Sequence, residues 1–412
     1  MNHQPEIIAP AGDLEKLKFA IAYGADAVYC GLPAISLRAR ENEFTLEDLI
    51  EARRLTREAG VKMYMTCNIF PRGPQLDFIE KFAAEQLPQI QPDAIIFADP
   101  GIFSIVKKHN PEMKFHLSVQ ANNVNAASVK FWYEQGVRRV IVARELSKFE
   151  IKAIHEAVPE MELEAFVHGS ICFTYSGRCL ISNYLLYRDG NRGTCGNVCR
   201  WKWKVFEVQE EQRPDENFLL EEDEHGSYLF NSKDLCLIQK MDELRDAGIS
   251  GFKIEGRHKT VGYLGTIVRA YKQALDDSIA GKAFDESLLR EVHAVANRGY
   301  TLGFFDGTQK DLQNYERKQQ ENPQNFLGIV SSTPGVATTP GVGVPVLVRN
   351  QFKVGEAVEI ITPTGVIPAT VKAIQSKKGE SQEVAHGGLS DPMLIDFGEP
   401  LSPMNLVRRA TT

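Results

Sequence analysis

The feature of this sequence that most constrains its fold is a repeated alternation, from residue 6 onward, of short apolar segments with longer amphipathic ones. The short segments are nearly continuous runs of Ala, Ile, Val, Phe and Met, a pattern typical of strands buried on both faces. Eight segments are candidate strands: Glu6–Pro10, Ala27–Gly31, Lys62–Asn68, Ala94–Asp99, Phe115–Gln120, Arg139–Arg144, Leu163–Gly169 and Gly251–Arg257. The alternation predicts an α/β fold built on a parallel sheet.

The amphipathic segments carry residues that start and stop helices. The segment 45–60 opens on Thr45 and ends on Gly60, which are favoured at helix N- and C-termini respectively. Further predicted helices are Asn125–Gly136, Ser147–Val158 and Thr260–Asp277. Eight β–α units in series close most economically into a TIM-like (β/α)8 barrel, with a doubly wound open sheet as the alternative. The first turn, 9–12, is not a G-x-G-x-x-G fingerprint, which argues against a dinucleotide fold.

Two regions depart from this pattern. After the seventh strand the next predicted helix begins only near Asp234, and a loop that long inside a compact domain is usually functional. This Cys-rich insertion, about 170–232, is expected to contain a hairpin-like pair, Lys202–Val208 and Tyr228–Asn231, joined by an acidic stretch. We therefore expect a barrel domain over 1–320 that carries the insertion.

Beyond the polar segment Glu316–Asn325, valine-rich strands alternate with Gly/Pro turns. This spacing predicts a second domain over 326–412, a small antiparallel β-barrel of about five or six strands.

Composition limits the location of the protein. The N-terminus lacks the charged and apolar regions of a signal peptide, and no apolar run is long enough to span a membrane. Seven cysteines are few for a secreted disulfide scaffold of 412 residues. The net charge of −7 argues against a surface that holds nucleic acid non-specifically. We expect a cytoplasmic protein with neither a membrane nor DNA as partner, although a local basic surface remains compatible with this charge.

Polar residues end several of the apolar strands, where the reactive groups of such barrels gather. They are Asn68, Asp99, Gln120, Arg144, Glu145, His168, Glu255 and Arg257. His168, Gln120 and Glu255 are candidates for handling protons, and the arginines Arg144 and Arg257 for binding an anion. The alternative is that these groups cap helices or pair with each other, as Glu255 and Arg257 could.

Four cysteines of the insertion, Cys172, Cys179, Cys195 and Cys199, have the spacing C-x6-C-x15-C-x3-C. Four thiolates from one loop could hold an iron–sulfur cluster or, despite the absence of C-x2-C knuckles, zinc. A third possibility is thiols without metal, with Cys172 activated by His168. Cys30, Cys67 and Cys236 are more often buried small hydrophobes, although Cys236, on a predicted helix, could replace one ligand.

The insertion is also basic and aromatic. Its cations are Arg178, Arg188, Arg192, Arg200, Lys202 and Lys204, and Tyr184, Tyr187, Trp201 and Trp203 are interleaved with them. Cations mixed with flat rings suit single-stranded nucleic acid, because phosphates can pair and bases can stack. Arg192 and Arg200 are therefore candidate substrate-binding residues. The alternative is a solvated loop whose aromatic rings shield the metal centre.

Longer motifs carry a family resemblance. Segments 164–172 and 175–182, EAFVHGSIC and YSGRCLIS, resemble the signature of the U32, or collagenase-like, peptidase family. The markers APAGD (9–13), SLRAR (36–40), RDGNRGTC (188–195), NSKD (231–234), KIEGR (253–257) and NRGY (297–300) extend the resemblance along most of the chain.

Within the family, the sequence most resembles the branch that hydroxylates tRNA. The resemblance implies a [4Fe–4S] cluster on Cys172, Cys179, Cys195 and Cys199, with Cys236 as rival for the fourth position. It also implies conversion of the wobble uridine in the tRNA anticodon loop to 5-hydroxyuridine, with prephenate as co-substrate.

Two other functions stay open from the residues alone. One is a peptidase that uses a Cys172/His168 thiol pair, although neither H-E-x-x-H nor G-x-S-x-G occurs. The other is a non-catalytic RNA-binding metalloprotein in which the cluster only organises the loop.

Overall fold

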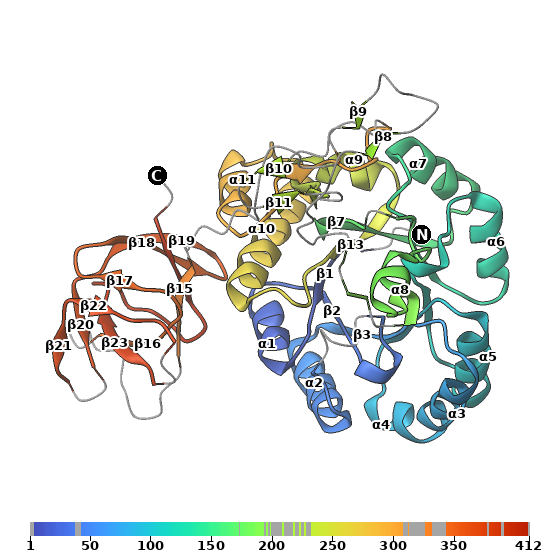
Figure 1. Ribbon diagram of the computed structural model, residues 1–412, viewed down its shortest axis with the longest axis horizontal. Helices are drawn as coiled ribbons and strands as arrows, with labels where there is room; N and C mark the ends of the chain where they lie inside the picture. The colour runs from blue at the N-terminus through green and yellow to red at the C-terminus, as the bar shows by residue number, and fades with distance from the viewer. Residues whose placement is uncertain are drawn as a thin grey trace.

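The computed structural model describes most of the chain. The described residues are 4–37, 43–172, 174–192, 195–196, 198, 208–209, 217–218, 222–223, 226–227, 232–307, 312, 326–331, 343–376, 379–388 and 391–410. Figure 1 shows a ring of helices around a barrel of strands, with a separate sheet to one side.

The eight predicted strands form a closed parallel barrel. They are β1 (Glu6–Pro10), β2 (Ala27–Cys30), β3 (Lys62–Cys67), β4 (Ala94–Phe97), β5 (Phe115–Leu117), β6 (Arg139–Ile141), β7 (Glu162–Ser170) and β13 (Ile249–Ile254). Neighbours along the chain pair in order from β1 to β7, and β13 pairs with both β7 and β1. The TIM-like architecture expected from the sequence is confirmed, and the open-sheet alternative is excluded by this closure.

Helices cover the outside of the barrel. They are α1 (Leu14–Ala22), α2 (Leu46–Ala59), α3 (Gly73–Lys81), α4 (Leu87–Ile90), α5 (Pro100–His109), α6 (Ala126–Glu134), α7 (Lys148–Ala157), α9 (Met241–Asp246), α10 (Val261–Ile279) and α11 (Glu286–His293). Thr45 forms a capping box with Asp48 at the start of α2, and Gly60 ends α2 with a left-handed φ of 68°. Asn125, Ser147 and Thr260 cap α6, α7 and α10 as predicted.

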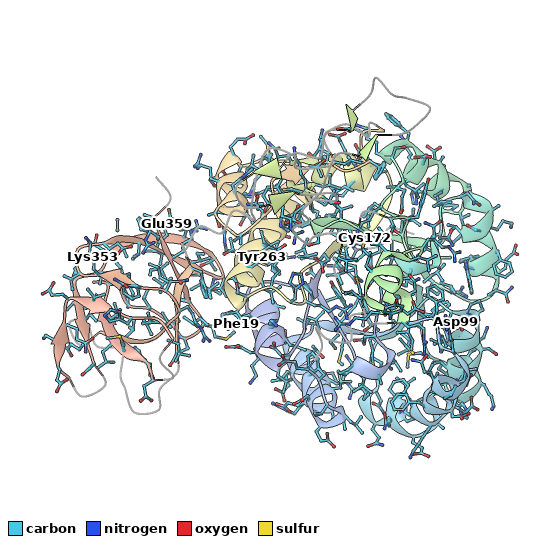
Figure 2. The ribbon with its side chains drawn as sticks, in the orientation of Figure 1. Phe19, Asp99, Cys172, Tyr263, Lys353 and Glu359 are labelled. Carbon is cyan, nitrogen blue, oxygen red and sulfur yellow. The ribbon has the colours of Figure 1, made fainter. Side chains whose placement is uncertain are left out.

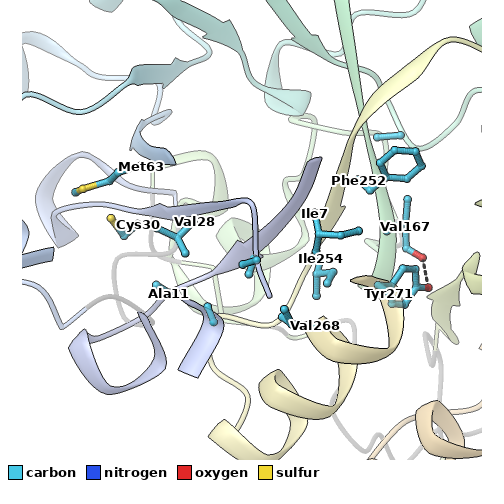
Figure 3. Packing of buried hydrophobic residues seen from close by; sticks show 14 of the residues in the cluster. Ile7, Ala11, Val28, Cys30, Met63, Val167, Phe252, Ile254, Val268 and Tyr271 are labelled. Carbon is cyan, nitrogen blue, oxygen red and sulfur yellow. Dashed lines mark hydrogen bonds between the residues drawn. The ribbon is translucent and has the colours of Figure 1, made fainter. Parts of the chain in front are cut away.

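The outer face of the barrel wall is apolar. Ile7, Val28 and Ile254 point toward the helices, and Figure 3 shows them in the layer that α10 covers with Val268 and Tyr271. Each of these side chains is essentially fully buried. Removing such surface from water supplies the main driving force that holds helices on the sheet.

Two short strands from outside the Cys-rich insertion extend the barrel sheet beyond β7. β12 (Asp234–Cys236) pairs antiparallel with β7, and β14 (Tyr300–Thr301) pairs parallel with β12. The helix predicted from Asp234 onward, with Cys236 on it, is thus wrong at its start, because residues 234–236 extend the sheet and α9 begins only at Met241.

Within the insertion, β8 (Val208–Gln209) pairs with β9 (Asn217–Phe218), and β10 (Glu222–Asp223) pairs with β11 (Gly226–Ser227). The predicted pairing of Lys202–Val208 with Tyr228–Asn231 falls almost entirely outside the described residues.

The C-terminal region forms an antiparallel half-barrel sheet. Its order is β19-β18-β24-β15-β16-β23-β20-β21, and a two-stranded sheet, β17 (Phe352–Lys353) with β22 (Val384–Ala385), accompanies it. The eight strands are β15 (Phe326–Val330), β16 (Val344–Val348), β18 (Ala357–Thr362), β19 (Gly365–Thr370), β20 (Ala373–Gln375), β21 (Ser381–Gln382), β23 (Met393–Asp396) and β24 (Leu406–Arg409). The sheet has more strands than the sequence pattern predicts. The linker 316–325 lies outside the described residues.

This sheet packs against α1 and α10, as Figure 1 shows. The Tyr23 hydroxyl donates to the backbone oxygens of Ile361 (2.8 Å) and Met404 (3.0 Å). Gly262 and Gly265 of α10 face the sheet so closely that a Cβ would meet Phe326 at 2.5 Å and Leu406 at 2.7 Å. No helix among the described residues is both long and apolar enough to cross a membrane.

Candidate functional site

A cavity opens at the carboxyl ends of the barrel strands, with about 1160 Å³ of empty space including its mouth. Its wall includes the predicted residues Gln120, Arg144, Glu255 and Arg257, together with Asn68. The short helix α8 (Ile181–Leu186) supplies part of the rim, and Figure 1 shows it inside the ring of outer helices. The structure therefore brings five of the predicted strand-end residues to one cavity.

Three of the four predicted ligands line the same cavity. Cys172 is exposed and lies within the ring of helices in Figure 2, whereas Cys179 and Cys195 are half-buried, and all three are free thiols. Cys199 lies outside the described residues.

The loop that carries these thiols is fixed in two places. Gly177 has a φ of +74°, and a Cβ there would lie 2.0 Å from the Gln120 backbone oxygen, so only glycine allows this approach. The Asn191 amide donates to the Cys179 oxygen (2.9 Å), and its side-chain oxygen accepts from the Cys179 nitrogen (3.4 Å).

The described thiols match the donor set of an iron–sulfur cluster. Three of the four predicted ligands line one cavity, and all three are thiols. Among the described residues, no group of three or more His, Cys, Asp or Glu side chains is arranged around one metal position. A [4Fe–4S] cluster takes one thiolate on each of four separate irons, whereas zinc binds all its ligands at one centre.

His168 and Cys236 lie on the other face of the barrel wall. A bulge in β7 places both Phe166 and His168 opposite consecutive residues of β13, Lys253 and Ile254. The extra residue reverses the alternation of side chains, so Phe166 lines the cavity while His168 points toward α10.

Burial lowers the pKa of His168 to about 3, and the ring is neutral at physiological pH. Its Nδ1 lies 3.2 Å from the Tyr271 hydroxyl. That hydroxyl also contacts the sulfur of Cys236 at 3.8 Å, and burial raises the pKa of this thiol. No hydrogen bond joins His168 to Cys172 in the described part of the chain, so the thiol pair needed for the peptidase alternative is not formed there.

Two other strand-end residues perform structural tasks. Asp99 caps α5 by accepting from the backbone nitrogens of Gly101 (2.8 Å) and Ile102 (3.2 Å). Glu145 accepts from the nitrogen (2.6 Å) and hydroxyl (3.2 Å) of Ser176, and so anchors the cysteine loop. For these two residues the capping and pairing alternative is correct.

The cavity wall is cationic on one side. Arg144 lies flat on Phe166, with 3.8 Å from its guanidinium carbon to the ring centre. No carboxylate in the described part of the chain pairs with it, so its edge is available to an anion. Arg257, buried in the same wall, lies over the Tyr29 ring at 5.5 Å.

Sequence reasoning missed a third cation, Lys253. It is 3% exposed, lines the cavity, and pairs through Nζ with Glu164 at 2.6 Å. Burial, together with Arg257 and Arg139, lowers its pKa against the opposing effect of Glu164. The signal was present, because Lys253, Glu255 and Arg257 alternate along the predicted strand Gly251–Arg257 and so were expected on one face of it.

Below Lys253 the barrel interior holds further charges. Arg139 contacts Glu6 (2.9 Å), Glu162 (2.5 Å) and Glu164 (3.5 Å). Lys62 also pairs with Glu6, and Lys253 pairs with Glu164, so three cations balance these three glutamates in a region that such barrels usually fill with branched apolar side chains.

Beside the cavity lies a second, open pocket that we call the arginine groove, lined by Phe70, Arg72, Gly177, Arg178, Leu180, Asp189, Asn191 and Arg192. Arg192 donates to the Gln75 side-chain oxygen (2.9 Å), and Arg72 contacts Asp189 at 3.4 Å. Tyr187, on the same loop, is 94% exposed. Arg200 lies outside the described residues.

Comparison with known proteins places the chain in a family. Residues 12–314 match peptidase family U32, and residues 322–408 match the peptidase family U32 C-terminal domain. The chain belongs to peptidase family U32. The resemblance carried by the sequence motifs is therefore confirmed.

Members of the family with assigned names extend over nearly the whole chain. The tRNA hydroxylation protein P of Escherichia coli (strain K12) is 41% identical over 93% of this chain and 92% of its own length. The tRNA hydroxylation protein P of Haemophilus influenzae is 39% identical over 99% of this chain and 98% of its own length. A solved structure of a U32 peptidase is 12% identical, with a TM-score of 0.39 over 62% of this chain and 95% of its own.

Proposed function

We propose that this protein forms 5-hydroxyuridine at the wobble position of tRNA, with prephenate as co-substrate and a [4Fe–4S] cluster as cofactor. The observation that carries the proposal is the convergence of three thiols, Cys172, Cys179 and Cys195, and two arginines, Arg144 and Arg257, on one barrel cavity. The relatives named as tRNA hydroxylation proteins, which match nearly the full chain, support the same function.

The cluster would be held by Cys172, Cys179, Cys195 and Cys199, and would supply one-electron chemistry at the cavity. Asn191 and Gly177 would fix the loop around Cys179 through the contacts described above. Cys236 is the rival fourth ligand, although its buried position beside Tyr271 disfavours it.

Iron content decides between the two cysteines. We expect anaerobically purified Cys199→Ala to lose iron and Cys236→Ala to keep it. The reverse result would assign the ligand to Cys236, and a colourless wild-type protein with stoichiometric zinc would contradict the cluster itself.

Prephenate carries two carboxylates, and the cationic side of the cavity suits such an anion. Arg144 presents an edge with several N–H donors while Phe166 supports its face. Arg257 lies in the same wall. Arg144→Gln is expected to weaken prephenate binding, whereas Arg138→Gln, which removes a cation outside the cavity, serves as the matched control.

The RNA would approach over the arginine groove. Arg72, Arg178 and Arg192 provide phosphate contacts, and the exposed ring of Tyr187 provides a stacking surface. A wobble uridine splayed out of the anticodon loop would then enter the cavity next to the groove.

Inside the cavity, Gln120 and Glu255 are the residues that we propose act on the uridine. The Gln120 side chain offers donors and an acceptor to a base edge. Glu255 is 6% exposed, and its carboxylate also accepts from the Ser170 nitrogen at 3.2 Å. It is the candidate for proton transfer, in place of His168, whose ring faces the outer layer.

The deciding experiment is mass spectrometry of tRNA from a strain that lacks this gene and any second hydroxylation pathway. We expect wobble 5-hydroxyuridine to disappear and to return when the wild-type gene is restored, but not with Arg144→Gln. Full modification in the deleted strain would overturn the function. A protein that binds tRNA and iron without changing the modification would be the non-catalytic RNA-binding alternative.

A further inference from the structure

Lys253 is a primary amine held at the wall of the cavity. Its side chain is 4% exposed, and its Nζ contacts Glu164, whose side chain is fully buried. Both residues lie on strands at the centre of the barrel wall, β13 and β7, which pair through this point of the sheet. A buried amine beside a carboxylate has an internal acceptor for the proton that it must lose before it can act as a nucleophile.

Two aromatic rings relate Lys253 to the arginines of the cavity. Lys253 Nζ lies 4.2 Å from the centre of the Tyr29 ring, over which Arg257 also lies. It is 5.7 Å from the centre of the Phe166 ring, on which Arg144 is stacked. Lys253 therefore shares one aromatic ring with each of the two arginines. All three cations line the same cavity, so an acid held by either guanidinium would occupy the cavity that the amine also lines.

We propose that Lys253 condenses with the carbonyl carbon of a 2-oxo acid bound in this cavity, to give a protonated imine (Schiff base). The acid's carboxylate would be held by Arg144 or Arg257. The inference rests on the proposed function only in that prephenate contains a 2-oxo acid group. It adds a covalent step that anion binding alone does not require.

The step balances without any other reactant. Glu164 takes one proton from the Lys253 ammonium, and the free amine adds to the carbonyl carbon to give a carbinolamine. One nitrogen proton moves to the oxygen as the carbinolamine forms, and Glu164 returns its proton to the resulting hydroxyl. The C–O bond then breaks, water leaves with these two protons, and the C=N bond forms with one proton left on nitrogen. No electrons are gained or lost. Hydrolysis by one water reverses the step and returns the acid and the amine.

The surroundings of Lys253 favour its neutral amine form, which imine formation requires. Burial and the nearby guanidinium groups of Arg257 and Arg139 oppose a proton on Lys253. A second buried lysine, Lys259, serves as a comparison. Its Nζ lies over the Tyr263 ring, away from the cavity wall.

Reductive trapping tests the proposal. The anaerobically purified full-length protein is incubated with phenylpyruvate, a stable 2-oxo acid, and sodium cyanoborohydride, which reduces an imine to a stable secondary amine. Peptide mass spectrometry is expected to find the reduced adduct on Lys253, with Lys259 unmodified. Phenyllactate, which has a hydroxyl in place of the carbonyl, gives no adduct and measures the background.

Lys253→Arg is the matched variant, because a guanidinium retains the charge beside Glu164 but does not form an imine. It is expected to lose the adduct while keeping the circular dichroism spectrum and iron content of the wild type. Prephenate added before phenylpyruvate is expected to reduce labelling of the wild type.

The two proposals fail separately. Wild-type protein that stays unlabelled at Lys253, or is labelled equally at surface lysines, overturns the imine but leaves tRNA hydroxylation intact. Labelling of Lys253 in a protein whose deletion leaves tRNA modification unchanged supports the imine and removes the tRNA function.

Discussion

The inner and outer faces of the barrel wall bury similar strands in opposite ways. On the outer face, Ile7, Val28 and Ile254 pack against helices as an apolar layer. On the inner face, the side chains of Glu6, Glu164, Arg139 and Lys253 are each at most 5% exposed and are paired as ions. Buried charges are costly unless paired, and so they are weak evidence for stability. The inner face also buries an apolar cluster that includes Ile8, Ile96 and Ile141, and of the four charged residues only Lys253 lines the cavity. The two faces therefore differ in that only the inner one depends on buried ion pairs.

The largest expected effect comes from breaking the inner ion pairs. Glu164→Ala leaves the buried amine of Lys253 without its carboxylate partner and removes one of the three carboxylates that contact Arg139, which keeps Glu6 and Glu162. We expect the free energy of unfolding to fall by roughly 3–5 kcal/mol in urea titration. Glu162 also pairs with Arg139, but its side chain is 27% exposed, so Glu162→Ala is the matched control with a smaller loss. Equal losses in the two variants would contradict a special cost for the inner charges.

Acid should destabilise both faces through one histidine on each. His116 inside and His168 outside are fully buried, and burial lowers the pKa of each below 6.5, to about 3 for His168. The unfolded chain binds these protons as the pH falls below about 6.5, whereas the folded chain does not, so stability decreases from that pH downward. For His168 alone we expect a loss of about 2 kcal/mol between pH 7.5 and 5.

Urea unfolding at the two pH values measures this loss. His168→Gln is expected to reduce the pH dependence, although carboxylates continue to contribute to it. A variant with the slope of the wild type would show that His168 is protonated in the folded protein.

Gly60 and Gly177 both have left-handed φ values, but Gly60 ends an outer helix whereas Gly177 lies at the mouth of the cavity. Alanine at each position therefore compares the two regions. Gly60→Ala at the end of α2 meets no atom within 4 Å, so only the φ of 68° costs energy, about 1 kcal/mol. Gly177→Ala adds an overlap with the Gln120 backbone to a similar φ penalty. We expect Gly177→Ala to unfold somewhat earlier than Gly60→Ala and, unlike it, to lose iron. If both variants kept their iron, the close approach of Gly177 to Gln120 would not be required for holding the cluster.

The smallest expected change lies in the outer layer. Ile254→Val removes one buried methylene opposite α10 and should cost about 0.5–1.5 kcal/mol, without effect on iron content or on trapping at Lys253. Thermal unfolding measures the cost. A change in iron or in labelling would mean that the two faces are coupled more closely than their packing indicates.

These contrasts also explain what the sequence could predict. The eight strands were found because burial on both faces leaves long apolar runs, and α2, α6, α7 and α10 because their caps are local signals. The cavity residues Gln120, Arg144, Glu255 and Arg257 followed from their places at strand ends.

The features that the sequence could not predict depend on which strands pair and in what register. One extra residue in β7 turns His168 away from Phe166, and nothing local in the sequence announces a bulge. The three residues of β12 are too short for a periodic signal, so Cys236 was placed on a helix. Asp99 and Gln120 both end predicted strands, but Asp99 is the N-cap of α5, whereas Gln120 lies in the 3-10 turn Val119–Ala121 at the cavity.

The contact between α10 and the C-terminal sheet bears on how this chain can be divided. Since Gly262 and Gly265 have no side chain on the face that Phe326 and Leu406 cover, removing the sheet would uncover helix backbone as well as apolar surface. The same helix packs Tyr271 against the barrel wall behind β7. The barrel is therefore not a free-standing module, and truncation, domain exchange or fusion at this boundary would require redesign of α10.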